Sequence, residues 1–101
     1  MSRREAVSGA LDRLAPGVPR FEREAILDHA LDSPGLRGAV PEKAAWLSMV
    51  AYIRHVLTDY DALLADGYDV DSARWFVAGD IDDVLEAWRS PRRLSPDDDP
   101  A

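Results

Sequence analysis

Six polar or ionisable residues crowd into eight positions of the stretch "YIRHVLTDYDALLADG", which covers residues 52–67. They are Arg54, His55, Thr58, Asp59, Tyr60 and Asp61. Histidine ionises near neutral pH and therefore suits proton transfer, and a carboxylate at its second ring nitrogen fixes the tautomer. On a helix, His55 and Asp59 are neighbours because they are four residues apart. The stretch predicts either a catalytic pair or a polar network that joins helices.

The catalytic hypothesis is a hydrolase centred on histidine and aspartate, with His55, Asp59 and Asp61 as candidate catalytic residues. A general base also needs a nucleophile, but the chain has no cysteine and no serine in a nucleophile-elbow context. A half-buried imidazole can equally be satisfied by Asp59 or by a backbone carbonyl of another helix. These residues therefore favour a protein that is not an enzyme, and they predict no cofactor.

A metal-dependent site is a variant of the same hypothesis. His29 is the other histidine of the chain, and antiparallel packing of two helices would bring it toward His55. Two histidines together with Asp59 and Asp61 could hold zinc or iron. The spacing lacks the pattern of an HExxH-type motif, so His29 and His55 are weak candidates for metal ligands.

Charge is unevenly distributed along the 101 residues, whose net charge is -7. Residues 1–58 hold eight basic and seven acidic side chains, whereas residues 59–101 hold four basic and twelve acidic ones. The acidic second half repels phosphates, which disfavours nucleic-acid binding by the chain as a whole. Arginines of the first half could still bind nucleic acid or phosphate, and this is a second alternative. The candidates are Arg20, Arg23, Arg37 and Arg54.

Apolar residues recur at helical spacing throughout, and they predict an all-α fold. We expect one small bundle of about four helices, with a long central third helix. The predicted helices cover residues 3–15, residues 19–32, residues 41–65 and a last segment that begins with Asp69 or Asp71 as its cap. Residues 1–90 would form this single domain, and residues 91–101 would be a disordered acidic tail.

The third helix has two possible forms. Its apolar stripe crosses Thr58 without a change of phase, which favours one continuous helix from residue 41 to about residue 65. In the alternative, the helix breaks at Thr58, which then caps a new helix with Asp61 at its third position. The stripe consists of Trp46, Val50, Ile53, Leu57, Tyr60 and Leu64.

Trp75 lies off the apolar stripe of the last helix, with Phe76 on its flank. An off-stripe tryptophan belongs either to a wide core face or to a partner surface. The leading hypothesis is a small soluble helical protein that acts as a non-enzymatic binding or interaction module. Its partner would be another protein or a second copy of the chain. The absence of cysteine and of a long apolar run predicts a cytoplasmic protein without a membrane span.

The stretch "IRHVLTDYDALL" also resembles the signature of the DUF2293 family, in which an Arg-His pair precedes Thr-x-Tyr-Asp on a helix. The matching positions are Arg54, His55, Thr58, Tyr60 and Asp61. Upstream, His29, Ala30 and Arg37 of "GLRG" are similar to a His-Ala pair before a turn. Downstream, Val84, Leu85 and Trp88 resemble a closing "VLxxW". The resemblance implies that Arg54, His55, Thr58, Tyr60 and Asp61 form a recurrent unit, but it names no activity and does not distinguish a structural network from a site. Arg54, Thr58, Tyr60 and Arg37 are candidate binding residues, although the turn that contains Arg37 is shorter than that of the family.

Overall fold

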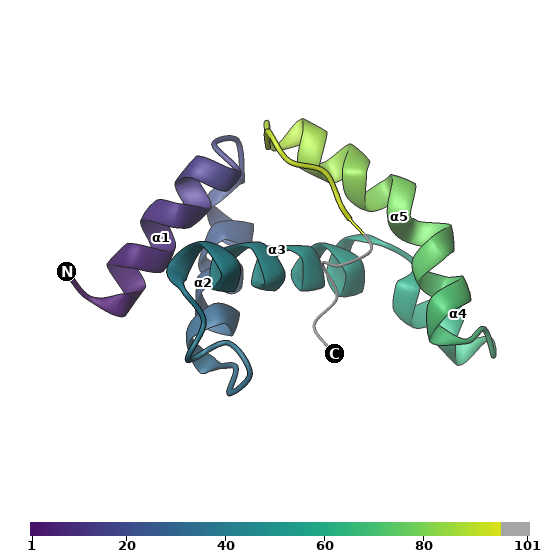
Figure 1. The fold of residues 1–101 in the computed structure, drawn as a ribbon. Coiled ribbons are helices and arrows are strands. Elements are labelled where there is room, and N and C mark those ends of the chain that lie inside the picture. The colour runs from purple at the N-terminus through teal and green to yellow at the C-terminus, as the bar shows by residue number, and fades with distance from the viewer. Residues whose placement is uncertain (96–101) are drawn as a thin grey trace.

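The computed structural model describes residues 1–95, which form five α-helices joined by loops and contain no strand. The helices are α1 (Arg3–Leu14), α2 (Arg20–Asp32), α3 (Pro41–Leu57), α4 (Tyr60–Ala65) and α5 (Val70–Ala87). α3 runs through the middle, with α1 and α2 at one end and α4 and α5 at the other (Figure 1). The predicted small all-α bundle is confirmed, with five helices in place of about four. None of these helices is long and apolar enough to cross a membrane.

α1 and α2 each bury one face against α3, because their apolar residues recur at steps of three and four. Ser48 of α3 is buried in this interface, and its hydroxyl donates to the carbonyl oxygen of Ile26 at 2.8 Å. The Tyr52 hydroxyl donates to a Glu22 carboxylate oxygen at 3.1 Å. The buried apolar side chains of these three helices are Val7, Ala10, Leu11, Ile26, Leu27, Ala30, Ala44, Ala45, Trp46, Met49, Val50 and Ile53.

The expectation of one continuous helix over residues 41–65 is wrong, because α3 ends at Leu57 and α4 begins at Tyr60. The Thr58 hydroxyl competes with the backbone at this point. It donates to the carbonyl oxygen of Arg54 and accepts the backbone N–H of Tyr60 at 3.2 Å. The break at Thr58 therefore occurs as in the alternative, although Thr58 receives the N–H of Tyr60 and not that of Asp61.

α5 begins with a side-chain cap, because Asp69 Oδ1 accepts the backbone N–H of Ser72 at 2.7 Å. This hydrogen bond lowers the pKa of the Asp69 carboxyl below its ordinary value. Of the two predicted caps, Asp69 is the one that the structure uses. The helix then continues without interruption through Gly79.

The C-terminal end of α5 forms a Schellman motif. The N–H of Ser90 reaches the carbonyl oxygen of Leu85, and the N–H of Arg89 reaches that of Glu86, both at 2.9 Å. Arg89 occupies the left-handed position of the motif with φ of 59°. A side chain in this conformation costs roughly 1 kcal/mol relative to glycine.

The loop between α1 and α2 contacts the end of α5. The N–H of Gly17 donates to the carbonyl oxygen of Trp88 at 2.8 Å. A Cβ atom at position 17 would lie 3.1 Å from both the carbonyl carbon and the oxygen of Trp88. Glycine therefore permits the close approach through which the first loop and the last helix are joined.

Residues 91–95 follow α5 without forming a helix. The N–H of Leu94 donates to Asp82 Oδ1 at 2.8 Å, and the Leu94 side chain packs against the core. The Arg92 guanidinium lies over the Trp46 ring, 4.1 Å from its centroid. The predicted disordered tail covers residues 91–101, of which residues 96–101 lie outside the described residues.

Candidate functional site

The corner between α3 and α4 brings together most of the polar cluster that the sequence singles out. Because the chain turns at Thr58 and Asp59, α4 leads back toward the last turn of α3. Asp61 thereby reaches His55, with its Oδ1 2.7 Å from His55 Nδ1. The expected pairing of His55 with Asp59 is wrong, since it required a continuous helix. Asp59 is instead the exposed residue immediately before α4.

The inner part of this cluster is buried. Tyr60 and Arg54 are each only 4% exposed, and the Arg54 guanidinium lies 5.7 Å from the centroid of the Tyr60 ring. The His55 ring is in edge-to-face contact with the Tyr60 ring, with 5.1 Å between the two centroids. Together with the two hydrogen bonds of Thr58, these contacts fix the angle between α3 and α4. Arg54, Thr58 and Tyr60 therefore contact one another across the corner between α3 and α4.

The outer part of the cluster faces solvent. The side chains of His55 and Asp61 are 52% and 62% exposed. A carboxylate on Nδ1 holds the imidazole so that Nε2 can exchange a proton, which is the arrangement of a general base. No nucleophile of the described residues hydrogen-bonds to this imidazole. The described contacts place a carboxylate on the imidazole but do not assemble a reaction around it.

The predicted metal ligands do not converge within residues 1–95. His29 is exposed on α2, and His55 is exposed at the end of α3. In this part of the chain, no group of three or more His, Cys, Asp or Glu residues is placed to hold a metal ion.

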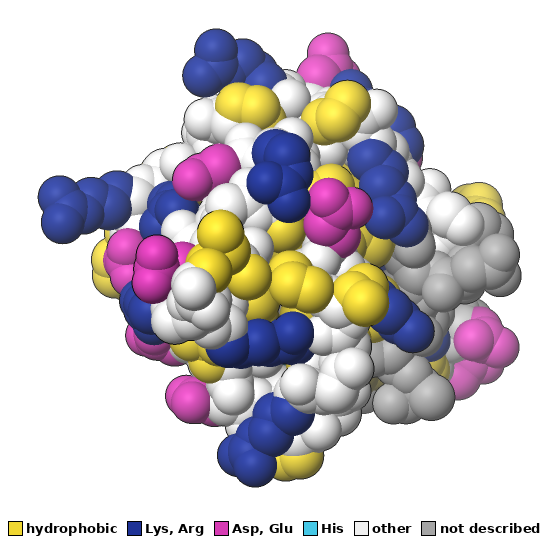
Figure 2. Space-filling view, turned by 60° about the vertical axis from the view of Figure 1, so that its left-hand side comes forward, with side chains coloured by type: hydrophobic (Ala, Val, Ile, Leu, Met, Phe, Trp, Pro, Cys, Tyr) yellow, Lys and Arg dark blue, Asp and Glu magenta, His cyan; other side chains and the backbone are white. Residues whose placement is uncertain are grey.

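The first-half arginines are mostly engaged in the fold. Arg23 binds Asp12 at 3.0 Å, and this hydrogen bond raises the pKa of its guanidinium. Arg54 is buried, while Arg20 is exposed at the first residue of α2 and Arg37 is exposed in the loop that follows α2. The four candidates therefore do not form one face. Figure 2 shows the side that carries α1 and α2, where basic and acidic side chains are interspersed.

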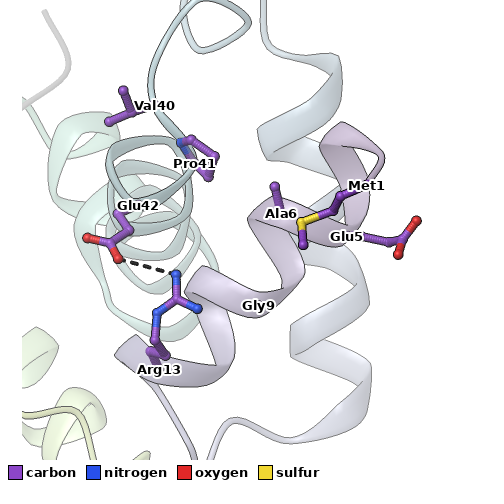
Figure 3. A pocket seen from close by; sticks show the side chains of 8 residues that line it. All are labelled: Met1, Glu5, Ala6, Gly9, Arg13, Val40, Pro41 and Glu42. Carbon is purple, nitrogen blue, oxygen red and sulfur yellow. Dashed lines mark hydrogen bonds and ion pairs between the residues drawn. The ribbon is translucent and has the colours of Figure 1, made fainter.

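A groove of about 460 Å³ lies between α1 and the start of α3 (Figure 3). Gly9 and Ala6 of α1 line it on one side, and Val40 and Pro41 line it on the other. At one end, Arg13 donates to Glu42 at 3.2 Å, so these two charges neutralise each other. The third charged side chain of the lining, Glu5, accepts the backbone N–H of Ser2 at 3.4 Å.

A different surface lies at the junction of α4 and α5, and we call its three aromatic residues, Tyr68, Trp75 and Phe76, the Trp75 surface. Phe76 is in edge-to-face contact with both neighbours, at 5.4 Å from Tyr68 and 5.3 Å from Trp75 between ring centroids. Trp75 is 76% exposed and Phe76 is 51% exposed. An open depression of about 300 Å³ is lined by Trp75, Phe76, Asp71 and Ser72.

The exposed face of α5 continues beyond the Trp75 surface. Gly79 follows Trp75 by four residues and Phe76 by three, so it lies one turn further along the same face. A Cβ atom at Gly79 would meet no heavy atom within 4 Å, and its φ is not positive. The fold therefore does not require glycine here, although glycine costs about 1 kcal/mol relative to alanine inside a helix.

Sequence reasoning found Trp75, and it left open whether this residue belongs to the core or to a surface. It missed Tyr68, whose ring reaches Phe76 from the loop before α5. The available signal was three aromatic residues within nine positions, none of which lies on the apolar stripe of the last helix.

A family described as an uncharacterized conserved protein, DUF2293, matches residues 10–89 of the chain. The match covers the whole polar corner and the Trp75 surface. No curated protein and no solved structure matches the chain.

Proposed function

Since the chain belongs to the DUF2293 family, whose description gives no activity, we propose from its surface that it is a non-enzymatic protein-binding module. The observation that carries this proposal is the exposed, contiguous Trp75 surface. Tyr68, Trp75 and Phe76 form the binding site, and the polar corner around Thr58 holds α4 and α5 in place behind it.

Three exposed aromatic rings that are linked through Phe76 have an energetic cost in water, because each ring buries a large apolar area when it is covered. Single exposed apolar residues are common and need no explanation. Phe21, for example, is 78% exposed on α2 without such ring contacts. Tryptophan and tyrosine are also the residue types that contribute most to protein interfaces. These properties support a docking role for the Trp75 surface and not for Phe21.

A second copy of the chain is a poor occupant of this surface. A symmetric dimer would place the same surface of both copies against each other. Between Asp59 and Ala87 the chain has nine acidic residues and one basic residue. Like charges would therefore face each other across the interface, which favours a different protein as the partner.

Photo-crosslinking in the source cells tests the proposal. p-Benzoylphenylalanine would be placed at position 75 in one variant and at position 21 in a control variant, since both native side chains are exposed to a similar extent. We expect a discrete adduct with another protein from position 75 and none from position 21. The adduct should disappear when Tyr68→Ala and Phe76→Ala are added to the first variant.

Three results would overturn the proposal. The first is the absence of any adduct from position 75, and the second is the same adduct pattern from both positions. The third is an adduct that consists of two copies of this chain, because the proposed partner is another protein.

A further inference from the structure

The charges next to the Trp75 surface indicate what kind of partner it binds. Asp83 and Glu86 follow Gly79 by four and seven residues, so they extend the same exposed face of α5. Asp71 lines the depression beside Trp75. The carboxylates of these three residues make no hydrogen bond or ion pair within residues 1–95, and each is exposed. A partner that covers this face must neutralise them, which requires lysine or arginine.

Gly79 indicates how closely the partner approaches. It lies between the aromatic end of the exposed face and its acidic end, and no neighbouring atom fills the space where a side chain would be. A missing side chain allows the axes of two packed helices to come nearer to each other. The position of Gly79 beside Trp75 and Phe76 is therefore explained if another backbone crosses α5 at this point.

The secondary structure of the fold restricts the mode of recognition. The described residues contain no sheet edge to which an extended peptide could add a strand. α5 presents an uninterrupted helical face, so the complementary element is an amphipathic helix. Its apolar residues would contact Trp75 and Phe76, and its basic residues would lie opposite Asp83 and Glu86.

We infer that the Trp75 surface binds a basic amphipathic helix of another protein, which crosses α5 at Gly79. This inference rests on the proposed function and names the chemistry of the partner. The aromatic rings supply apolar contact, the carboxylates select positive charge, and Gly79 sets the distance between the two helices.

The experiment is a display selection with the full chain as bait and a random peptide library as the probe. The peptides would be long enough for about four helical turns. The library would be counter-selected against the Trp75→Ala variant, so that only peptides that depend on the Trp75 surface are retained. We expect the retained peptides to carry net positive charge and apolar residues at steps of three and four.

Matched variants then test each part of the inference with one retained peptide. Gly79→Ala should raise the Tm of the protein and weaken binding about tenfold or more. Gly9→Ala is the control, because it makes the same change inside α1, where the new Cβ would have only one neighbouring atom, at 3.6 Å. It should leave binding unchanged. Asp83→Asn with Glu86→Gln should also weaken binding and reduce its salt dependence, whereas Asp32→Asn on α2 should not.

The outcomes separate the inference from the proposed function. If no peptide prefers the wild type over Trp75→Ala, both fail. If peptides are retained but are acidic, neutral or proline-rich without helical spacing, only the inference is overturned. Wild-type affinity of the Gly79→Ala variant would also overturn the inference, because a helix could then not cross α5 at this residue.

Discussion

The two ends of α3 carry opposite kinds of surface. At the end covered by α1 and α2, charged side chains bind one another between elements. Arg4 contacts Glu24 and Asp28, and Arg23 contacts Asp12. At the end covered by α4 and α5, Asp61 pairs with His55, but the exposed carboxylates of Asp71, Asp83 and Glu86 have no such partner among the described residues. The aromatic rings of the Trp75 surface also face solvent there.

This difference indicates where the molecule is available to interact. Charges that already bind each other between α1 and α2 have little left to offer a ligand. Unpaired carboxylates can instead pair with the positive charges of a partner, and exposed rings are stabilised when they are covered. The first end of α3 therefore serves mainly to hold the chain together. The second end is the part that we assign to recognition, and three measurements test this division.

The largest expected effect separates core from surface. Leu11→Ala removes a fully buried side chain of α1 and should lower the free energy of unfolding by about 2–5 kcal/mol. Trp75→Ala removes a larger but exposed side chain and should change the free energy of unfolding by less than about 0.5 kcal/mol. Urea unfolding followed by circular dichroism measures both. A comparable loss in Trp75→Ala would mean that the aromatic rings hold the fold together and are not kept for a partner.

An intermediate effect is expected at the boundary between the two ends. Thr58→Val keeps the shape of the side chain but removes the hydrogen bonds to Arg54 and Tyr60, so it should cost about 1–3 kcal/mol. Thr58→Ser retains a hydroxyl and should retain most of the stability. Equal losses for the two variants would show that the hydroxyl does not fix the corner.

The smallest effect is expected for the salt bridges between α1 and α2, at the first end of α3. A double-mutant cycle with Arg23→Ala and Asp12→Ala should give a coupling energy of about 0.2–1 kcal/mol, because Asp12 is exposed. The coupling should decrease as salt is added. A coupling that is unaffected by salt would contradict the view that these are screened surface pairs.

The regular part of the fold could be predicted from the sequence because burial imposes a period on each helix. Val7 and Leu11 of α1, or Val77 and Ile81 of α5, are four residues apart and share a buried face. The cap at Asp69 could be predicted for a similar reason, since it depends on residues that are close in sequence.

The corner at Thr58 could not be predicted from the period alone. The apolar stripe keeps its phase across the break in the sequence, but Ile53 and Tyr60 are buried in different helices, and Leu57 between them is 41% exposed. The decisive contact is the hydrogen bond from the Thr58 hydroxyl to the carbonyl oxygen of Arg54. The hydrophobic pattern of the sequence does not indicate whether this hydroxyl binds the backbone or water. The corner also determines which carboxylate His55 binds, because the turn at Thr58 brings Asp61, and not Asp59, to the imidazole.

The Trp75 surface was only partly predictable. A tryptophan that lies off the apolar stripe can still be buried by a neighbouring helix. The sequence does not predict which helices lie beside Trp75, so its exposure could not be predicted. The contact of Tyr68 with Phe76 depends on the path of a loop that has no period.

The burial of the tryptophans has an optical consequence. Trp46 and Trp88 are 1% and 7% exposed, so their indole rings are shielded from water in the folded chain, whereas Trp75 is in contact with it. The red edge of the fluorescence emission and the part quenched by acrylamide therefore come mainly from Trp75. A partner that covers this ring would shift the emission to shorter wavelengths and protect it from the quencher, so that docking can be titrated without any added label.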